Sequence, residues 1–169
     1  MDLHSLKPDD EESRSFSSSL ENEAEIARQL LRHRLLSELM GGILPSSLDL
    51  SQVRRVLDVS CGAGGWAYDM AWRYPDVHVT GIDTSAYFIE QAQAFADPRV
   101  TNVSYVMQDM RLLPGGIFSA EMFDLIHLRF LVGKMMPVEF PGLLGSLIGL
   151  CRVGGLLVWT EAEMPITTS

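Results

Sequence analysis

Three aspartates and one glycine-rich turn are the residues of this chain whose types and spacing best suit the binding of a ligand. Asp58, Asp83 and Asp109 each lie at or near the end of a β-prone run. The turn with Gly62 and Gly64 follows the first of these runs. Glycine adopts positive φ readily and lets a ligand come close to the main chain. A helix after the turn would offer unpaired N–H groups to the polar end of that ligand, so the turn predicts a binding site.

A regular alternation of strand and helix patterns positions these residues. The predicted strands cover residues 56–59, 77–82, 100–106, 123–128 and 156–160, and the predicted helices cover residues 23–40, 86–96 and 137–152 and a run from Trp66. The alternation favours a Rossmann-like α/β fold, with a mostly parallel sheet of about five strands and helices on both faces in three layers. Right-handed crossovers then bring the loops after the strands to one rim, where ligands of such sheets bind.

Composition divides the chain into three segments. Residues 1–20 are acidic and rich in serine, which predicts a mobile tail. Residues 21–52 hold a helical segment and a loop, and residues 53–169 form the ligand-binding domain. The helix carries an apolar stripe of Ala27, Leu31, Leu35 and Leu39, widened by Ile26, Leu30, Leu36 and Met40.

Charge and hydropathy argue against several classes of protein. The net charge of −9 is concentrated in residues 1–25, which hold eight acidic residues against two basic ones. The remaining chain has 14 acidic and 11 basic residues without a basic cluster, which argues against nucleic acid as a partner. No apolar run reaches 18 residues and the N-terminus has no signal pattern, so we predict no membrane association and a cytoplasmic location.

The two cysteines have no metal-type spacing, and no metal site is predicted. Cys61 lies near the N-terminus of a predicted helix, a position that can lower a thiol pKa and favour a nucleophile. A packing role is the favoured interpretation of Cys61.

The stretch Val56–Trp66 resembles the first motif of the class I S-adenosylmethionine (SAM)-dependent methyltransferases. That motif has an acidic residue, an aliphatic residue and then Gly-x-Gly-x-Gly. Asp58 corresponds to the acidic residue, and Ser60 replaces the first glycine. Gly62 and Gly64 match the other two glycines.

Later parts of the chain extend the resemblance from about residue 54 to residue 161. Asp83 and Asp109 match the family's acidic residues after the second and third strands. Residues 123–127 resemble its fourth strand, whose end faces the reactive methyl group, and residues 152–157 resemble the turn before its fifth strand.

This resemblance implies SAM as the cofactor. Asp83 would accept hydrogen bonds from both ribose hydroxyls, Asp109 would accept one from the adenine amino group, and the Met110 N–H would serve the adenine ring. Asp58 would orient the turn and the methionine ammonium. The implied cofactor-binding residues are Asp58, Ser60, Cys61, Gly62, Gly64, Asp83, Thr84, Asp109 and Met110.

The implied activity is transfer of a methyl group from SAM to a small-molecule acceptor. The sulfonium already activates the methyl group, so a catalytic base is optional. His127 is the candidate base, and Arg129 is a candidate to hold an acidic substrate.

Two other functions stay open at this point. Gly62, Gly64 and Ala67 also fit the dinucleotide pattern G-x-G-x-x-G/A of an NAD(P)-dependent oxidoreductase. A non-catalytic SAM-binding domain is the second alternative.

The chain has no room for the antiparallel hairpin with which the family usually ends its sheet. The fifth strand, Leu156–Thr160, would then be an apolar edge that invites association. We therefore expect either a fragment of a longer chain or a homodimer that pairs through this edge.

Overall fold

The computed structural model describes residues 8–113, 117–132 and 134–161, and the side chains from residue 22 onward. The helices are α1 (Pro8–Leu39), α2 (Gly65–Arg73), α3 (Ala86–Phe95) and α4 (Phe140–Leu150), with the 3-10 turns η1 (Met110–Leu112) and η2 (Pro137–Glu139). The strands are β1 (Arg55–Val59), β2 (His78–Asp83), β3 (Val103–Met107), β4 (Phe123–Arg129) and β5 (Cys151–Thr160).

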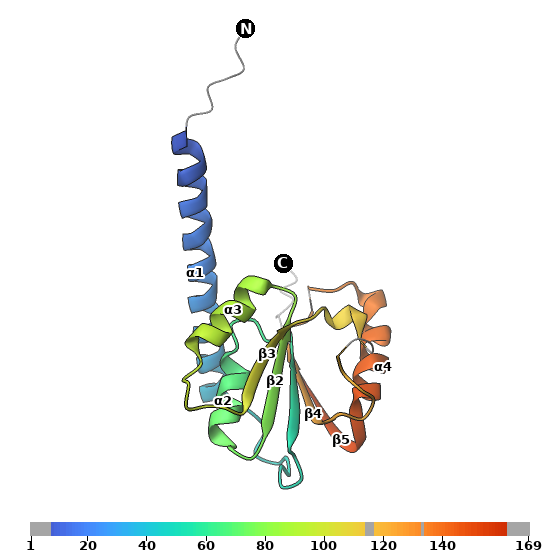
Figure 1. The fold of residues 1–169 in the computed structure, drawn as a ribbon. Coiled ribbons are helices and arrows are strands. Elements are labelled where there is room, and N and C mark those ends of the chain that lie inside the picture. Colours follow the sequence, from blue (N-terminus) through green and yellow to red (C-terminus); the bar gives the residue numbers. More distant parts are fainter. Residues whose placement is uncertain (1–7, 114–116, 133, 162–169) are drawn as a thin grey trace, which may run out of the picture.

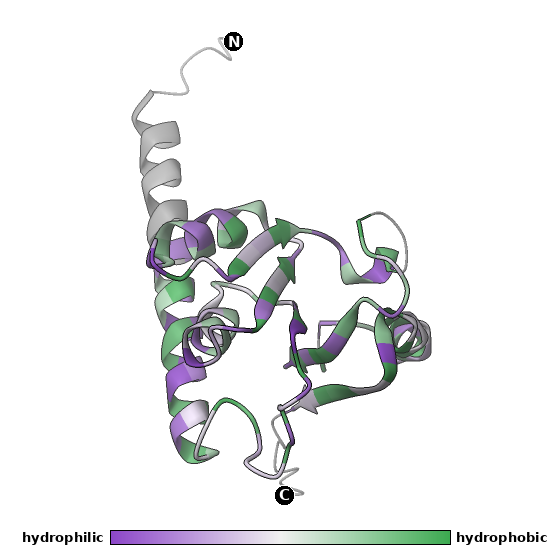
Figure 2. Cartoon of the chain, turned by 60° about the horizontal axis from the view of Figure 1, so that its bottom comes forward, coloured by the Kyte–Doolittle hydropathy of each residue, from purple (hydrophilic) through white to green (hydrophobic). Residues whose placement is uncertain are grey.

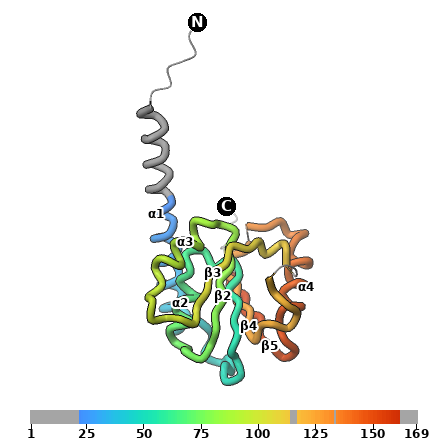
Figure 3. Tube along the Cα trace, in the orientation of Figure 1, coloured from blue at the N-terminus to red at the C-terminus, as the bar shows by residue number. Residues whose placement is uncertain are grey.

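The five strands form one sheet in the order β3-β2-β1-β4-β5, and every neighbouring pair is parallel. Helices α2 and α3 cover one face with α1 beside them, and α4 covers the other face (Figures 1 and 3). The strand order reverses between β1 and β4, which is where ligands bind in open sheets of this type. The predicted Rossmann-like α/β fold with three layers is confirmed.

The sheet is buried on both faces because apolar side chains alternate between them. Val56 and Leu125 point toward α2 and α3, whereas Leu57 and Ile126 point toward α4. Figure 2 shows hydrophobic segments along the strands, interrupted by hydrophilic positions. Polar side chains inside a buried sheet need hydrogen-bond partners. Two of them, Asp58 and His127, belong to the site described below.

Helix α1 differs from the prediction in length and in its buried side. It begins at Pro8, so the predicted tail of residues 1–20 is helical from residue 8, and residues 1–7 lie outside the described residues. Within the predicted stripe Ile26 is buried, whereas Leu31 and Leu39 are 57% and 84% exposed. The helix turns its polar Gln29 toward the fold instead, because that side chain hydrogen-bonds to the glycine-rich turn.

The end of α4 also differs from the prediction. The helix ends at Leu150 and β5 begins at Cys151, so residues 151–155 belong to the strand and do not end the helix. A register shift between Phe123 and Leu125 accommodates the extra residues of β5, and Gly154 has a φ of +75° there.

Among the described residues, β5 pairs with β4 and its other side has no strand partner. The homodimer through this edge stays a prediction. No helix in the described part of the chain is both long and apolar enough to cross a membrane, and the cytoplasmic location stays a prediction as well.

Candidate active site

The glycine-rich turn after β1 has a left-handed backbone at three positions. Ser60, Gly62 and Gly64 have φ values of +59°, +55° and +79°. Ser60, which stands where the resembled motif has glycine, therefore carries a side chain in a conformation that disfavours one. The Cys61 N–H donates to the Ile82 carbonyl at 2.9 Å, which ties the turn to β2.

The two glycines of the turn face different neighbours. A side chain at Gly62 would collide with the carboxamide of Gln29. A Cβ at Gly64 would lie 2.7 Å from the Cβ of Ala92 and 2.7 Å from Cε1 of Tyr105, so Gly64 packs against α3 and β3. The Tyr105 hydroxyl also donates to the Gly64 carbonyl at 3.1 Å. Gly62 thus borders the rim, whereas Gly64 is required for packing.

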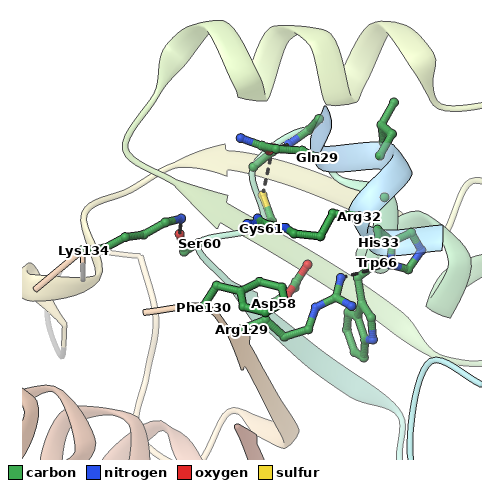
Figure 4. Close-up of a pocket in the computed structure, with 14 residues that line it drawn as sticks. Gln29, Arg32, His33, Asp58, Ser60, Cys61, Trp66, Arg129, Phe130 and Lys134 are labelled. Atoms are coloured by element: carbon green, nitrogen blue, oxygen red, sulfur yellow. Dashed lines mark hydrogen bonds between the residues drawn. The ribbon is translucent and has the colours of Figure 1, made fainter. Parts of the chain in front are cut away.

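A first, narrow cleft that opens to solvent lies between the turn, α1 and the end of β4 (Figure 4). Asp58 is 3% exposed and lies in its wall. The Asp58 Oδ1 atom is 2.8 Å from Nδ1 of His127, while the buried Oδ2 atom has no hydrogen-bond partner among the described residues. An unsatisfied buried carboxylate oxygen next to a cleft is suited to a cationic or N–H-bearing ligand.

Asp58 and His127 meet because they are register partners on the adjacent strands β1 and β4. A carboxylate only accepts hydrogen bonds, so Nδ1 of His127 donates and carries the proton. The imidazole stacks on the indole of Trp66, with ring centroids 3.6 Å apart and planes 7° from parallel. The Trp66 Nε1–H in turn donates to the Ile43 carbonyl at 2.8 Å.

The structure places His127 beneath Trp66, where it is 1% exposed and does not line the first cleft. Burial lowers the pKa of His127, against the opposing effect of its hydrogen bond to Asp58. A general base must reach the proton that it abstracts, and this placement does not bring the imidazole to the cleft. The geometry fits a residue that orients Asp58 better than it fits the predicted base.

The pH dependence of the free energy of unfolding should show that His127 is buried in its neutral form. Its folded pKa is below the ordinary 6.5, so the unfolded chain takes up a proton first as the pH falls through that value. The free energy of unfolding is therefore expected to decrease below about pH 6.5, by up to about 1.4 kcal/mol per pH unit. Denaturant titrations between about pH 7 and pH 5 measure this slope. His127→Gln should flatten it and His78→Gln, at an exposed site on β2, should not; equal slopes in both variants would contradict the assignment.

A second, wider cleft continues along the rim toward β2 and β3. The buried Asp83 lies in its wall and accepts the Gly62 N–H at Oδ2 and the Ser85 N–H at Oδ1, at 2.9 and 3.0 Å. A carboxylate has about four acceptor sites, so Asp83 can also take hydroxyl groups of a ligand. Thr84 and Met110 line the same cleft.

Asp109 does not line the second cleft, although its neighbours Gln108 and Met110 do. Its Oδ1 atom accepts the backbone N–H of Arg111 at 2.9 Å and the Nε–H of Arg111 at 3.0 Å. The hydrogen bond from the Arg111 side chain lowers the pKa of Asp109. Asp109 thus begins η1 with its Oδ1 atom on Arg111, and its contact with the adenine stays a prediction.

The two clefts meet at residues that line both of them, namely Gln29, Ser60 and Lys134. The Lys134 ammonium donates to the Ser60 hydroxyl at 3.1 Å (Figure 4). Gln29 accepts the Ala63 N–H at 3.0 Å and so holds α1 against the turn. The result is one elongated site with a carboxylate toward each end, Asp58 in one cleft and Asp83 in the other.

Cys61 lines the first cleft but does not have the character of a nucleophile. Burial, followed by the nearby carboxylates of Asp58 and Asp83, raises the pKa of its thiol well above the ordinary value. The packing interpretation of Cys61 therefore fits the structure.

Several residues of the site were not singled out as site residues from the sequence. Gln29, Arg32 and His33 of α1 face the first cleft together, and Phe130 lies opposite them (Figure 4). The signal for the helix residues is their spacing, because positions three and four apart share one side of a helix. Lys134 and Gln108 lie in loops, where no periodicity marks their direction.

The chain is similar to known proteins in sequence and in fold. Residues 56–155 match the methyltransferase domain family. Methyltransferase str2 of Strobilurus tenacellus is 31% identical over 146 residues, which cover 83% of this chain and 49% of str2. The chain thus spans about half the length of that relative.

Two solved structures share the fold. The PH0226 protein from Pyrococcus horikoshii OT3 has a TM-score of 0.62 at 22% identity, over 76% of this chain and 58% of that chain. Phosphoethanolamine N-methyltransferase 1 of Haemonchus contortus, solved with phosphoethanolamine and S-adenosylhomocysteine (SAH), has a TM-score of 0.58 at 22% identity, over 69% of this chain and 24% of that chain. With a glycine turn, two rim carboxylates, a parallel sheet and a family match over residues 56–155, this chain belongs to the methyltransferase domain family, within the class I SAM-dependent methyltransferases.

Proposed function

We propose that this protein transfers a methyl group from SAM to a small-molecule acceptor at the rim of the sheet. The observation that carries the proposal is the unsatisfied, buried Oδ2 atom of Asp58 beside the glycine-rich turn. SAM has an ammonium group at one end and ribose hydroxyls toward the other, and the elongated site holds Asp58 and Asp83 in its two clefts. The residues present therefore fit this cofactor.

Each end of the site would hold a different part of SAM. Asp58 Oδ2 would accept the ammonium, and Asp83 would accept the ribose hydroxyls while it keeps the Gly62 N–H in place. Gln108 and Met110, which line the second cleft, would contact the adenine. When bound, SAM supplies a methyl group on a sulfonium that is already activated for transfer.

The protein residues then act by orientation and by exclusion of water. His127 fixes Asp58 through the hydrogen bond at Nδ1, and Trp66 packs over the imidazole. Helix α1 covers the turn through the Gln29 hydrogen bond. We assign His127 as a positioning residue, since none of these tasks needs a proton from the acceptor to reach it.

A small-molecule acceptor is supported by one protein that shares the fold, and by the charge distribution of this chain. The Haemonchus contortus enzyme, which shares the fold, was solved with phosphoethanolamine. The folded part of this chain has no basic cluster in sequence of the kind that a nucleic-acid backbone requires. A methyl-transfer screen distinguishes this proposal from a non-catalytic SAM-binding domain.

Calorimetry tests the proposal directly. The chain is expected to bind SAM and SAH, whereas NADH should bind far more weakly, because the dinucleotide has no ammonium to pair with Asp58. Tighter binding of NADH than of SAM would overturn the proposed function and restore the oxidoreductase alternative.

Asp58→Asn tests the ammonium contact. The amide keeps an oxygen for His127 but replaces the free acceptor by an N–H₂ group, so SAM affinity should fall by roughly ten- to a hundredfold. The same variant should bind 5′-methylthioadenosine, which lacks the amino-acid part, as well as the wild type does. Equal losses for both ligands in calorimetry would remove Asp58 from the ammonium site.

A further inference from the structure

Two guanidinium groups in the first cleft have no carboxylate partner within the described part of the chain. Arg32 comes from α1 and Arg129 ends β4, and both line the cleft. Six other arginines each lie within 4.0 Å of an aspartate or glutamate, namely Arg28, Arg34, Arg73, Arg99, Arg111 and Arg152. Among the arginines with described side chains, Arg54 and Arg55 also have no carboxylate within 4.0 Å, but they do not line the first cleft.

The contacts of the pair are made with uncharged groups. The Arg32 guanidinium lies 4.2 Å from the centroid of the Phe130 ring. An Nη2–H of Arg129 donates to Nδ1 of His33 at 3.0 Å, because Nε2 of His33 donates to Asp69 at 3.1 Å and leaves Nδ1 as an acceptor. These contacts orient both guanidinium groups and leave most of their N–H donors for a ligand.

The backbone at this point is held in an uncommon conformation. Phe130 has a φ of +56°, which is costly for a bulky residue, and its N–H donates to the Thr160 carbonyl at 3.0 Å. The next two N–H groups, of Leu131 and Val132, donate to the Glu161 carboxylate at 2.6 and 3.0 Å. Hydrogen bonds within the fold thus hold the end of β4 and the residues just after it, without a ligand.

The charges of the whole site leave a surplus of positive charge. The joined clefts are lined by three cations, Arg32, Arg129 and Lys134, and by two carboxylates, Asp58 and Asp83. Arg111 also lines the second cleft, but its charge is balanced by Asp109. SAM would add one further positive charge, since its sulfonium and ammonium outnumber its carboxylate. Burial lowers the pKa of Arg129, and the charge of Arg32 adds to that effect, whereas the carboxylates of Asp58 and Asp69 act against it.

We propose that Arg32 and Arg129 bind an oxyanion of the methyl acceptor, so that the acceptor carries a carboxylate or a phosphate next to the atom that is methylated. This inference rests on the proposed function. The planar guanidinium group matches both oxyanions with two parallel hydrogen bonds. The surplus of charge remains after the cofactor's own carboxylate has been counted, which assigns the anion to the acceptor.

The binding of small anions to the SAH-loaded protein tests the assignment. Malonate and inorganic phosphate serve as oxyanion probes, and malonamide is the neutral match of malonate. We expect at least one oxyanion to bind, with about tenfold or greater loss of affinity in Arg32→Gln and Arg129→Gln. Arg34→Gln is the control, because it removes one positive charge from the same helix at an exposed site outside the first cleft. The preferred probe distinguishes a carboxylate acceptor from a phosphate acceptor.

Any of the following results would overturn the assignment. One is that neither oxyanion binds the SAH-loaded wild type, or that malonamide binds as well as malonate. Another is that Arg34→Gln lowers the affinity for the oxyanion as much as Arg32→Gln does. The third is that both cleft variants lose SAM affinity but keep that for decarboxylated SAM, which would assign the pair to the cofactor's carboxylate. Arg32 lies on a helix surface, so its variant tests the proposal even if Arg129→Gln does not fold. Absence of SAH binding to the wild type would instead contradict the proposed function.

Discussion

Asp83→Ala is expected to weaken SAM binding by about 3 kcal/mol, or roughly a hundredfold or more. Two effects combine in this loss. The hydrogen bonds from the ribose hydroxyls disappear, and the buried Gly62 N–H loses its acceptor at 2.9 Å, which releases the turn. Calorimetry measures the affinity, and denaturant unfolding should show an additional stability loss of about 1–3 kcal/mol.

Asp76→Ala is the matched control for this experiment. Asp76 lies near the opposite end of β2 and is exposed, so SAM affinity and stability should both stay near the wild-type values. Unchanged SAM affinity in Asp83→Ala would remove Asp83 from the site.

Gly64→Val is expected to destabilise the fold itself by about 2–5 kcal/mol. The new side chain would meet Ala92 and Tyr105 at less than 3.0 Å, and it would have to adopt the φ of +79° that glycine tolerates. Loss of SAM binding should follow from unfolding and not from a blocked ligand. Urea titration monitored by circular dichroism gives the free energy of unfolding.

Gly142→Ala, which also adds a side chain at a glycine, is expected to raise stability where Gly64→Val lowers it. Gly142 lies in α4 with no atom within 4 Å of an added Cβ, so the variant should gain about 0.5–1 kcal/mol of stability. A Gly64→Val protein with wild-type stability that fails to bind SAM would show that Gly64 faces the ligand after all.

Local sequence patterns were sufficient for the parts of the fold that depend on neighbours in the chain. The run from Val56 into the glycine turn predicts a strand, a turn and a helix, and the structure has β1 and α2 there. Asp83 could be assigned to the rim because right-handed crossovers place the ends of successive parallel strands at one edge. The family follows from the same patterns, since its motifs lie in these local units.

The partners of the buried polar groups could not be derived from local pattern, because they depend on which strands and helices lie side by side. Asp58 meets His127 only because β4 lies next to β1 in a register that pairs the two residues. That contact buries the imidazole and leaves the other oxygen of Asp58 free for a ligand.

Contacts between distant elements likewise decided which residues face the site. The apolar stripe of α1 suggested one buried side, but only part of it is buried: Ile26 is buried and Leu31 is exposed, while the polar Gln29 contacts the turn. Asp109 is in a position typical of a ligand contact, and the structure adds that its Oδ1 atom accepts two hydrogen bonds from Arg111. The sequence by itself therefore determined the fold class, the family and the rim where the site lies. Tertiary packing decided which side chains enter that site, because each buried polar group takes the partner that the packed elements bring within hydrogen-bond distance.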